Sequence, residues 1–300
     1  MRKTILVTGA TGAQGGSVAR ELLRRGSFRV RALTRTIATA EARTLRSLGV
    51  DVVRGDLFDV DSVIDAMDGC HGVFGVTSYW EHFEREEELG TNLVDAAAET
   101  GIEHLVLSTQ PPVHEVTDGE LSVPEFDLKA RTAERARRLG IPTTFVRPAF
   151  FYENFTTLFA PQRQPDGTYL FGFPQGDAPL AAFAAEDTGG LVAAVFDRRD
   201  EYLDRTLDLA GDEATADHYA RVMSRASGRL IRFRDVPRDV FAAYAFRGAR
   251  ELADRFTYYR TAVPSRAQEI ARGRDLYPSL QSFEQWAWRH LPLLEQVLAA

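Results

Sequence analysis

The stretch TILVTGATGAQGGSVARELL, residues 4–23, begins as a short β-branched run and ends in an amphipathic pattern. Gly9, Gly12, Gly15 and Gly16 stand where the predicted strand turns into the predicted helix. The first N–H groups of a helix lack partners within the helix and carry the positive end of its dipole. An anion such as a pyrophosphate satisfies both properties when the backbone comes close to it, and glycine permits that approach.

Each glycine has a separate expected role in this turn. Gly9 would form the turn itself, Gly12 would admit phosphates, and Gly15 would let the helix pack closely on the strand. The spacing GxxGxxG differs from the commoner GxGxxG, and a glycine-rich turn that binds nothing is the alternative. The position of the motif, after the first strand of a strand–helix series, favours a dinucleotide site.

Short β-branched runs alternate with amphipathic stretches through the first half of the chain. Strands are expected at 4–8, 29–34, 51–54, 72–77, 104–109 and 142–147, and helices at 14–26, 38–48, 59–68, 83–100 and 125–139. This alternation predicts an α/β fold with a doubly wound parallel sheet, a Rossmann domain over residues 1–150. A helix at 186–198 and a strand at 205–210 suggest that residues 184–212 return to that sheet.

The pattern changes after residue 150. Residues 151–183 are rich in Phe, Pro and Gly and are interpreted as an irregular, aromatic-lined segment. Together with residues 213–300 they would form a smaller α+β cap region that binds a substrate or partner. Within it, Thr215 is expected to cap a helix, followed by a strand at 229–234 and helices near 237–246, 248–260 and 281–298. We expect a ligand cleft between this region and the carboxyl ends of the strands.

Composition excludes several classes of function. The formal net charge of −7 over 300 residues argues against direct nucleic-acid binding. No run reaches the roughly 20 apolar residues of a membrane span. The single cysteine, Cys70, allows no intramolecular disulfide, which favours a cytoplasmic location. The six histidines are scattered without the spacing of a metal site, so no metal is expected. The acidic run at residues 84–88 is interpreted as a solvated surface.

The residues after the second and third strands indicate which dinucleotide binds. Arg35 follows the second strand, where NAD-binding proteins place a carboxylate for the ribose hydroxyls. A guanidinium at this position suits a 2′-phosphate, so NADP(H) is predicted; a solvent-exposed arginine is the alternative. After the third strand, Asp56 would accept a hydrogen bond from the adenine amino group and Leu57 would provide an apolar wall.

With these pieces in place, the chain resembles the NmrA-like family of atypical short-chain dehydrogenases/reductases, and within it the branch of NADP(H)-sensing regulators. The match is carried by the segments TGATGAQGGSVARELL, VRALTR, VRGDLFD, VTSYWE, EFDLKA, VRPAFFYENF, GDEATADHYA, RGARELADRF and SFEQWAWRH. The resemblance implies dinucleotide contacts at Gly9, Ala10, Thr11, Gly12, Ala13, Gln14, Gly15, Arg35, Asp56, Leu57, Thr77, Ser78, Tyr79, Lys129, Phe151, Tyr152, Glu153 and Asn154. Asn92 stands where this branch has a lysine, which removes a positive charge near the cofactor.

The catalytic signature of active short-chain dehydrogenases is incomplete. That signature is YxxxK with an upstream serine, and Ser108 and Lys129 occupy two of its positions. Glu125 stands in the tyrosine position, and an ionised carboxylate cannot donate a proton. The catalytic residues are therefore undetermined. Tyr152, His82 and Ser108 are candidates, and packing is the alternative for the aromatic ones.

Two functions are compatible with these observations. The first is a redox sensor in which NADP(H) changes the conformation or association of the protein, and hence its affinity for a protein partner. The second is an NADPH-dependent reductase of a small quinone, carbonyl or imine, with the aromatic segment as its pocket. A sugar epimerase or dehydratase is disfavoured because such enzymes depend on the missing tyrosine. Whether the chain forms a homodimer stays open.

Overall fold

The helices and strands of the chain fall into two units. The computed structural model describes residues 2–299. The first unit comprises the chain up to Pro112 together with Glu125–Pro148 and Ala185–Asp208, and the second comprises Val113–Pro124, Ala149–Ala184 and the chain from Leu209 onward. The sequence placed residues 113–124 in the Rossmann domain, whereas the structure assigns them to the second unit.

A seven-stranded sheet forms the centre of the first unit. In spatial order its strands are β11 (Thr206–Leu209), β6 (Thr143–Pro148), β5 (His104–Ser108), β4 (Gly72–Gly75), β1 (Thr4–Val7), β2 (Arg29–Thr34) and β3 (Asp51–Arg54). Neighbouring strands from β3 to β6 pair in parallel, with registers such as Ile5 opposite Val30 and Val106 opposite Thr144. The predicted doubly wound parallel sheet is confirmed.

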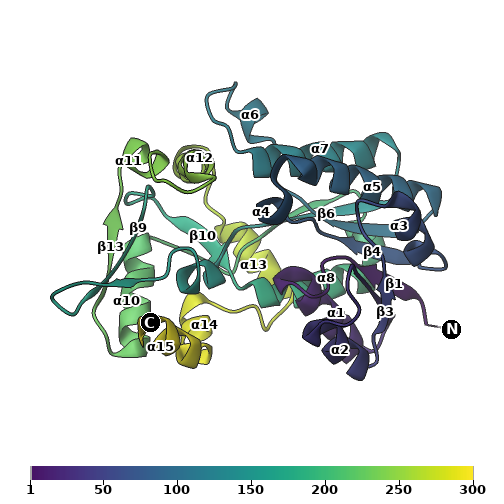
Figure 1. Cartoon of the computed structure of the whole chain (residues 1–300), viewed down its shortest axis with the longest axis horizontal. Helices are drawn as coiled ribbons and strands as arrows, with labels where there is room; N and C mark the ends of the chain where they lie inside the picture. Colours follow the sequence, from purple (N-terminus) through teal and green to yellow (C-terminus); the bar gives the residue numbers. More distant parts are fainter. Residues whose placement is uncertain (1, 300) are drawn as a thin grey trace. The chain divides into compact units, whose positions relative to one another are not determined.

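Helices cover both faces of this sheet. One face carries α1 (Ala13–Arg25), α2 (Ala40–Ser47) and α8 (Thr188–Asp197), and the other carries α3 (Val60–Met67), α5 (Glu86–Glu99) and α7 (Pro124–Arg138) (Figure 1). Strand side chains such as Leu6, Val73 and Leu105 are buried in one cluster with Leu93 and Ala136 from the second set of helices. Burial on both faces explains why these strands are continuous apolar runs.

Short elements complete the first unit. They are α4 (Tyr79–His82), η1 (Phe83–Arg85), η3 (Ala185–Asp187) and α9 (Arg199–Tyr202). The helix α1 ends at Gly26, which has the left-handed backbone expected of a glycine cap, with φ of 69°. Strand order reverses at β1, because β2 lies on one side of it and β4 on the other. Ligands of doubly wound sheets bind at the carboxyl ends of the strands beside such a switch point.

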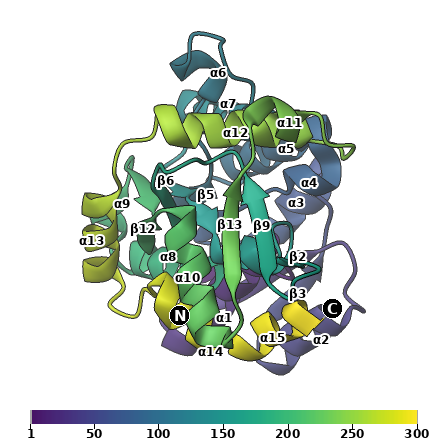
Figure 2. The same cartoon turned by 90° about the vertical axis from the view of Figure 1, so that its left-hand side faces the viewer.

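The second unit contains two small sheets. One has the order β12 (Asp212–Ala214), β10 (Leu180–Phe183), β7 (Phe150–Phe151), and the other has the order β13 (Ile231–Asp235), β9 (Tyr169–Phe173), β8 (Gln162–Arg163). Figure 2 shows β13 and β9 side by side, with α10 next to β13. The interpretation of residues 151–183 as irregular is therefore wrong. Tyr169, Phe171 and Phe173 alternate with less buried residues, which is the period of a strand.

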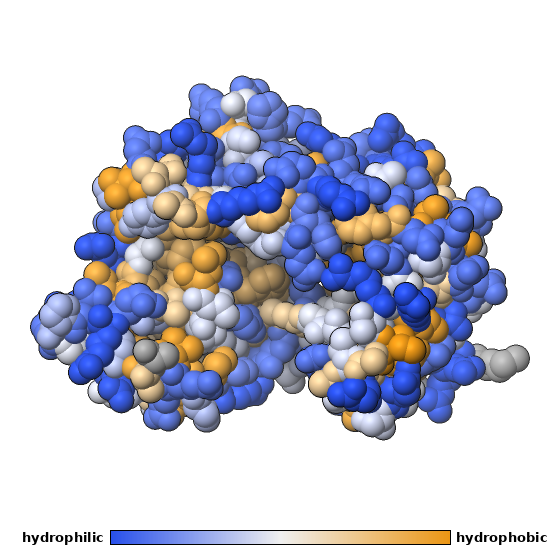
Figure 3. All heavy atoms as spheres, in the orientation of Figure 1, coloured by the Kyte–Doolittle hydropathy of each residue, from blue (hydrophilic) through white to orange (hydrophobic). Residues whose placement is uncertain are grey.

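The remaining helices all belong to the second unit. They are α6 (Val113–Val116), η2 (Tyr152–Thr156), α10 (Ala216–Ser227), α11 (Arg238–Ala242), α12 (Ala249–Thr261), α13 (Ala267–Leu276), α14 (Phe283–Arg289) and α15 (Leu291–Ala299). The predicted helix N-cap at Thr215 is confirmed, since the Thr215 hydroxyl accepts a hydrogen bond from the His218 amide at 3.2 Å. Apolar residues reach the surface over α11 and the turn that follows it, where Val240, Tyr244 and Phe246 are exposed (Figure 3). Among residues 2–299, no helix combines the length and apolar character that a membrane crossing requires.

Candidate functional site

The switch point of the sheet is fastened by one threonine. Thr8 follows β1, and its hydroxyl donates to the Val76 carbonyl at 3.0 Å and accepts from the Val76 amide at 2.8 Å. The two bonds hold the end of β1 against the end of β4. The glycine-rich loop of residues 9–12 starts from this fixed point.

The geometry at Gly9 and Gly15 agrees with the roles that the sequence suggested, whereas the contact of Gly12 with phosphates stays a prediction. Gly9 has a φ of +57°, and a Cβ there would lie 2.8 Å from Val76 Cγ1. A Cβ on Gly15 would lie 2.4 Å from the carbonyl oxygens of both Gly9 and Thr8, so any side chain would push α1 off the strand. A Cβ on Gly12 would meet nothing closer than the Gly9 carbonyl oxygen, at an ordinary 3.4 Å. The fold therefore requires glycine at 9 and 15, whereas at 12 it leaves room.

In the part of the chain that the structure describes, the N-terminus of α1 has neither a side-chain cap nor a negative charge. Within the described residues, its N-cap Gly12 offers no side-chain hydrogen bond and the first turn carries no acidic residue. Two other helices of this unit are capped instead by side-chain oxygens, α2 by Thr39 and α3 by Asp59. An uncapped helix start leaves its positive end and its N–H groups for a ligand. A dinucleotide diphosphate fits this end, because the free volume at Gly12 lets it approach the backbone.

Arg35 lies directly after β2, at the same carboxyl edge of the sheet. Its Nη2 atom lies 3.3 Å from Oε2 of Glu81 on α4, and the two side chains are 56% and 60% exposed. The arginine is thus accessible to a phosphate and is also the partner of a carboxylate. Sequence reasoning did not identify Glu81, because it is 46 residues away along the chain.

The loop after β3 is held by Asn92. Its Nδ2 atom donates to the Leu57 carbonyl at 2.8 Å, which ties α5 to this loop. One oxygen of the half-buried Asp56 carboxylate accepts from the Phe58 amide at 3.0 Å. At position 92, where the resemblance implies a lysine, this chain therefore has an uncharged side chain that contacts the loop. Both Asp56 and Leu57 stay predicted adenine contacts.

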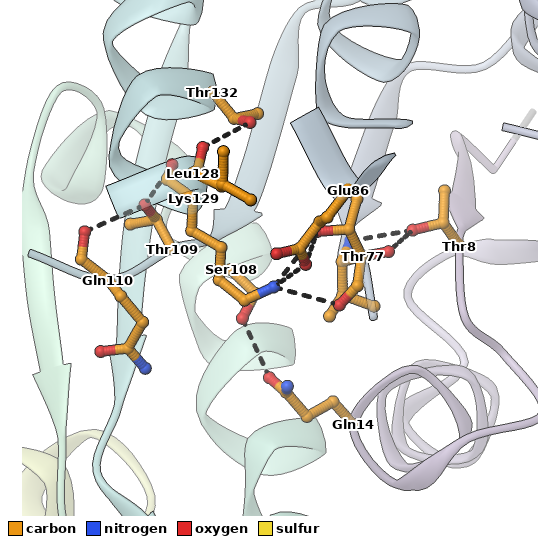
Figure 4. A network of polar contacts seen from close by, with 11 residues as sticks. Thr8, Gln14, Thr77, Glu86, Ser108, Thr109, Gln110, Leu128, Lys129 and Thr132 are labelled. Carbon is orange, nitrogen blue, oxygen red and sulfur yellow. Dashed lines mark hydrogen bonds and ion pairs between the residues drawn. The ribbon is translucent and has the colours of Figure 1, made fainter. Parts of the chain in front are cut away.

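Lys129 is the centre of a buried polar network (Figure 4). Its ammonium group bonds the Glu86 carboxylate and lies 3.2 Å from the Thr77 hydroxyl and 3.3 Å from the Thr77 carbonyl. The Thr77 hydroxyl in turn donates to Glu86 at 2.6 Å. An ammonium group has three protons, and these three acceptors match them. Lys129 is therefore a member of an internal ion pair, and its predicted contact to the cofactor would require one of these bonds to be exchanged.

The interpretation of residues 84–88 as a solvated surface is wrong at Glu86. The side chains of Glu86 and Lys129 are only 2% and 10% exposed. Glu86 begins α5 and shares its buried face with Leu89 and Leu93, at the helical spacing of three and seven residues. This spacing was the signal in the sequence that would have placed Glu86 inside. Its Oε2 atom is buried without a hydrogen-bond partner among the described residues.

The predicted catalytic candidates occupy different surroundings. Ser108, at the end of β5, donates to the Gln14 side-chain oxygen at 3.1 Å, which joins it to the first turn of α1. The His82 ring on α4 lies edge-on to Phe58, with centroids 5.1 Å apart. Ser108 and His82 thus have separate partners within the first unit, and the catalytic role of each stays a prediction.

Tyr152 belongs to the core of the second unit. It is fully buried, with its ring 5.0 Å from that of Phe283 and 5.6 Å from that of Trp286. These surroundings are those of a packing residue. The ring of Phe151 packs against that of Phe183 in the same unit, with centroids 5.4 Å apart.

The remaining predicted contacts lie at the starts of two short helices. Ser78 is the N-cap residue of α4 and Tyr79, which is buried, is its first residue. Glu153 and Asn154 lie in η2, where the Asn154 carbonyl accepts from the Phe159 amide at 2.8 Å. The loop residues Ala10, Thr11 and Ala13 lie between the glycines described above.

Within residues 2–299, no cluster of three His, Cys, Asp or Glu side chains could hold a metal ion.

Comparison with known proteins identifies the family of this chain. The model of the NmrA-like family matches residues 1–287. A curated relative, the NmrA-like family domain-containing oxidoreductase FrzB of Cladobotryum sp, is 31% identical over 272 residues, which cover 83% of this chain and 81% of FrzB.

Solved structures share the fold over the whole chain. NmrA, a negative transcriptional regulator, was solved in complex with NADP and also with NAD; in both it is 23% identical, with a TM-score of 0.86 over 100% of this chain and 99% of that one. The NADPH-dependent quinone oxidoreductase QOR2 of Escherichia coli, complexed with NADPH, is 19% identical, with a TM-score of 0.78 over 96% and 99% of the two chains. At these identities the likeness establishes the fold alone. The family model that matches residues 1–287 and the 31% identity to FrzB show that the chain belongs to the NmrA-like family.

Proposed function

We propose that this chain binds NADP(H) at the start of α1 and acts as a redox sensor, through a conformation or association that depends on the cofactor. One observation carries the binding site: the uncapped helix start lies beside Gly12, where the fold needs no glycine and leaves space. The amides of residues 13–15 would hold the diphosphate and Arg35 the 2′-phosphate. The complexes of NmrA with NADP and of QOR2 with NADPH support this choice of cofactor.

The polar groups near this edge support sensing over catalysis. The bound dinucleotide would supply hydride chemistry, and a typical dehydrogenase adds a proton donor beside it. Here Glu125 replaces the tyrosine, Ser108 donates to Gln14, and the Lys129 ammonium is paired with Glu86. A sensor needs no proton donor. It needs two protein states with different affinities for the nucleotide, because equal affinities would shift nothing.

A titration tests the binding site and the sensor function separately. Calorimetry with NADPH and NADP⁺ should give binding to the unmodified chain, and Gly12→Ala should weaken it at least about tenfold, which is about 1.4 kcal/mol. The thermal stability of Gly12→Ala without nucleotide is the control, and it should stay near that of the unmodified chain because the added carbon meets nothing closer than 3.4 Å. Light scattering with the two nucleotides then follows protein size. An unchanged size, together with no effect of either nucleotide on the binding of a partner, would contradict the sensor.

A reductase is the second candidate, and the names of the relatives favour it. FrzB is called an oxidoreductase, and QOR2 is a quinone oxidoreductase. Hydride transfer to a strongly electrophilic acceptor such as a quinone needs little help from a proton donor, so the missing tyrosine does not exclude it. NADPH absorbance followed across quinones, aldehydes, enones and imines tests this function. Turnover of none of them would contradict it.

A further inference from the structure

The guanidinium assigned to the 2′-phosphate already has a carboxylate beside it. Arg35 and Glu81 come from the loop after β2 and from α4, and their Nη2 and Oε2 atoms are 3.3 Å apart. The same Glu81 oxygen lies 3.7 Å from Nε2 of His82. A 2′-phosphate that binds the Arg35 guanidinium would therefore find the negatively charged Glu81 carboxylate already beside Nη2.

This ion pair is easily exchanged. Both side chains are more than half exposed, and exposed pairs contribute little to stability because water and salt screen them. A phosphate group carries up to two negative charges and offers three oxygens to the planar guanidinium, which it can engage through two bonds at once. The phosphate should thus displace the carboxylate, but only after overcoming its repulsion and its competition.

The helix that carries Glu81 is short, and Glu81 is its exposed member. Tyr79 anchors the start of α4 through burial, and His82, with a side chain 19% exposed, packs on Phe58. Glu81, in contrast, is 60% exposed and has the exposed Arg35 as its partner. Phe83 follows with φ of 50° and ψ of −127°. A bulky residue rarely adopts positive φ, and such strain is found at switch segments. The other described non-glycine residues with positive φ are aspartates, which tolerate it.

We propose that Glu81 is a specificity-determining residue that competes with the 2′-phosphate of the dinucleotide for Arg35. While no phosphate is present, Glu81 occupies the guanidinium and α4 stays linked to the loop after β2. Binding of NADP(H) frees Glu81 and with it the far end of α4, whereas NAD(H) leaves the pair intact. Glu81 thus reduces the ratio by which the protein prefers NADP(H) over NAD(H). It also couples binding of the 2′-phosphate to the position of α4. This inference rests on the proposed NADP(H) site.

Glu81→Gln tests the competition directly. The substitution removes the charge and keeps the size, so the Kd for NADP⁺ should fall by about three- to tenfold while the Kd for NAD⁺ changes less than about twofold, as expected for one exposed like charge. Glu88→Gln is the matched control. It removes the same charge from a similarly exposed pair, with Arg85 at 3.2 Å, and should leave the ratio of the two Kd values unchanged.

Trp80 provides a second measurement on α4 itself. Its ring is partly exposed and contacts those of Tyr79 and Phe83, so its fluorescence should respond when α4 shifts. NADP⁺ should change the emission more than NAD⁺ does. This difference between the two nucleotides should be smaller in Glu81→Gln. It should be absent in Trp80→Phe, whose emission comes only from the other tryptophans and serves as the background.

The outcomes separate the inference from the function on which it rests. An unmodified chain that binds neither nucleotide overturns both. Binding of NADP⁺ with a Kd ratio that is the same in Glu81→Gln and Glu88→Gln overturns the inference alone, as does weaker NADP⁺ binding by Glu81→Gln. An equal response of Trp80 to both nucleotides overturns the link to α4.

Discussion

Replacing Lys129 with methionine is expected to cost about 3–5 kcal/mol of unfolding free energy, the range for a buried charge that loses its partner. Methionine keeps most of the side-chain length and removes the ammonium group. Glu86, 2% exposed, would then keep only the Thr77 hydroxyl at 2.6 Å, and its second oxygen is already without a partner among the described residues. The large cost thus comes from the carboxylate left behind, rather than from the intrinsic strength of the pair.

Urea unfolding followed by circular dichroism, without nucleotide, measures this cost. Arg131→Met is the matched control, because Arg131 lies on the same helix and pairs at 3.2 Å with Glu87, the neighbour of Glu86. That pair is 63% and 48% exposed, so its loss should cost less than about 1 kcal/mol. The comparison isolates burial, since helix, partner type and change of charge are alike.

A double-mutant cycle completes the experiment. Removing both charges with Lys129→Met and Glu86→Leu should return stability to near that of the unmodified chain, because apolar side chains can replace a buried pair at little cost. The interaction energy should be several kcal/mol. The reasoning is refuted if Lys129→Met costs no more than the Arg131 control, or if the two single costs simply add in the double variant. A loss of nucleotide binding in a Lys129 variant is interpretable only beside this measurement.

Three further predictions concern the fold and the site. Gly15→Ala should lower the thermal midpoint and abolish nucleotide binding, because its Cβ would lie 2.4 Å from two backbone oxygens; a stable variant that binds normally would contradict the packing role. His104 is buried and its pKa is lowered to about 4, first by burial and then by the charge of a nearby arginine. Because the unfolded chain takes up the proton near pH 6.5 and the folded chain does not, stability should fall by up to about 3 kcal/mol as pH falls from 6.5 to 4. Urea titrations over this range should show a flatter dependence in His104→Gln but not in a variant of the exposed His114, and an unchanged slope in His104→Gln would be the contrary result. Asn92→Leu should weaken NADP⁺ and NAD⁺ equally and by a few-fold, since it loses the bond to the Leu57 carbonyl, worth about 1 kcal/mol; calorimetry that shows a selective effect on NADP⁺ would assign Asn92 to the phosphate instead.

Local patterns in the sequence were sufficient for most of the first unit. The strand expected at 142–147 is observed at Thr143–Pro148, and the helix expected at 125–139 at Pro124–Arg138. In the second unit the sequence missed β9, although Tyr169, Phe171 and Phe173 alternate in burial. Its aromatic residues and glycines resemble a loop in composition, and pairing with β13 and β8 gives the segment its ladder.

The sequence by itself determined the glycine turn, because the conformation at Gly9 and the closeness of helix and strand at Gly15 depend on residues within one strand–turn–helix unit. Only the tertiary structure decided which charges meet. Lys129 pairs with Glu86 across 43 residues, and Arg35 with Glu81 across 46. In the sequence alone, each of these four charged residues is a plausible surface residue. The sheet brings them together at one edge, and burial there turns one pair into a structural core element while exposure leaves the other free to exchange.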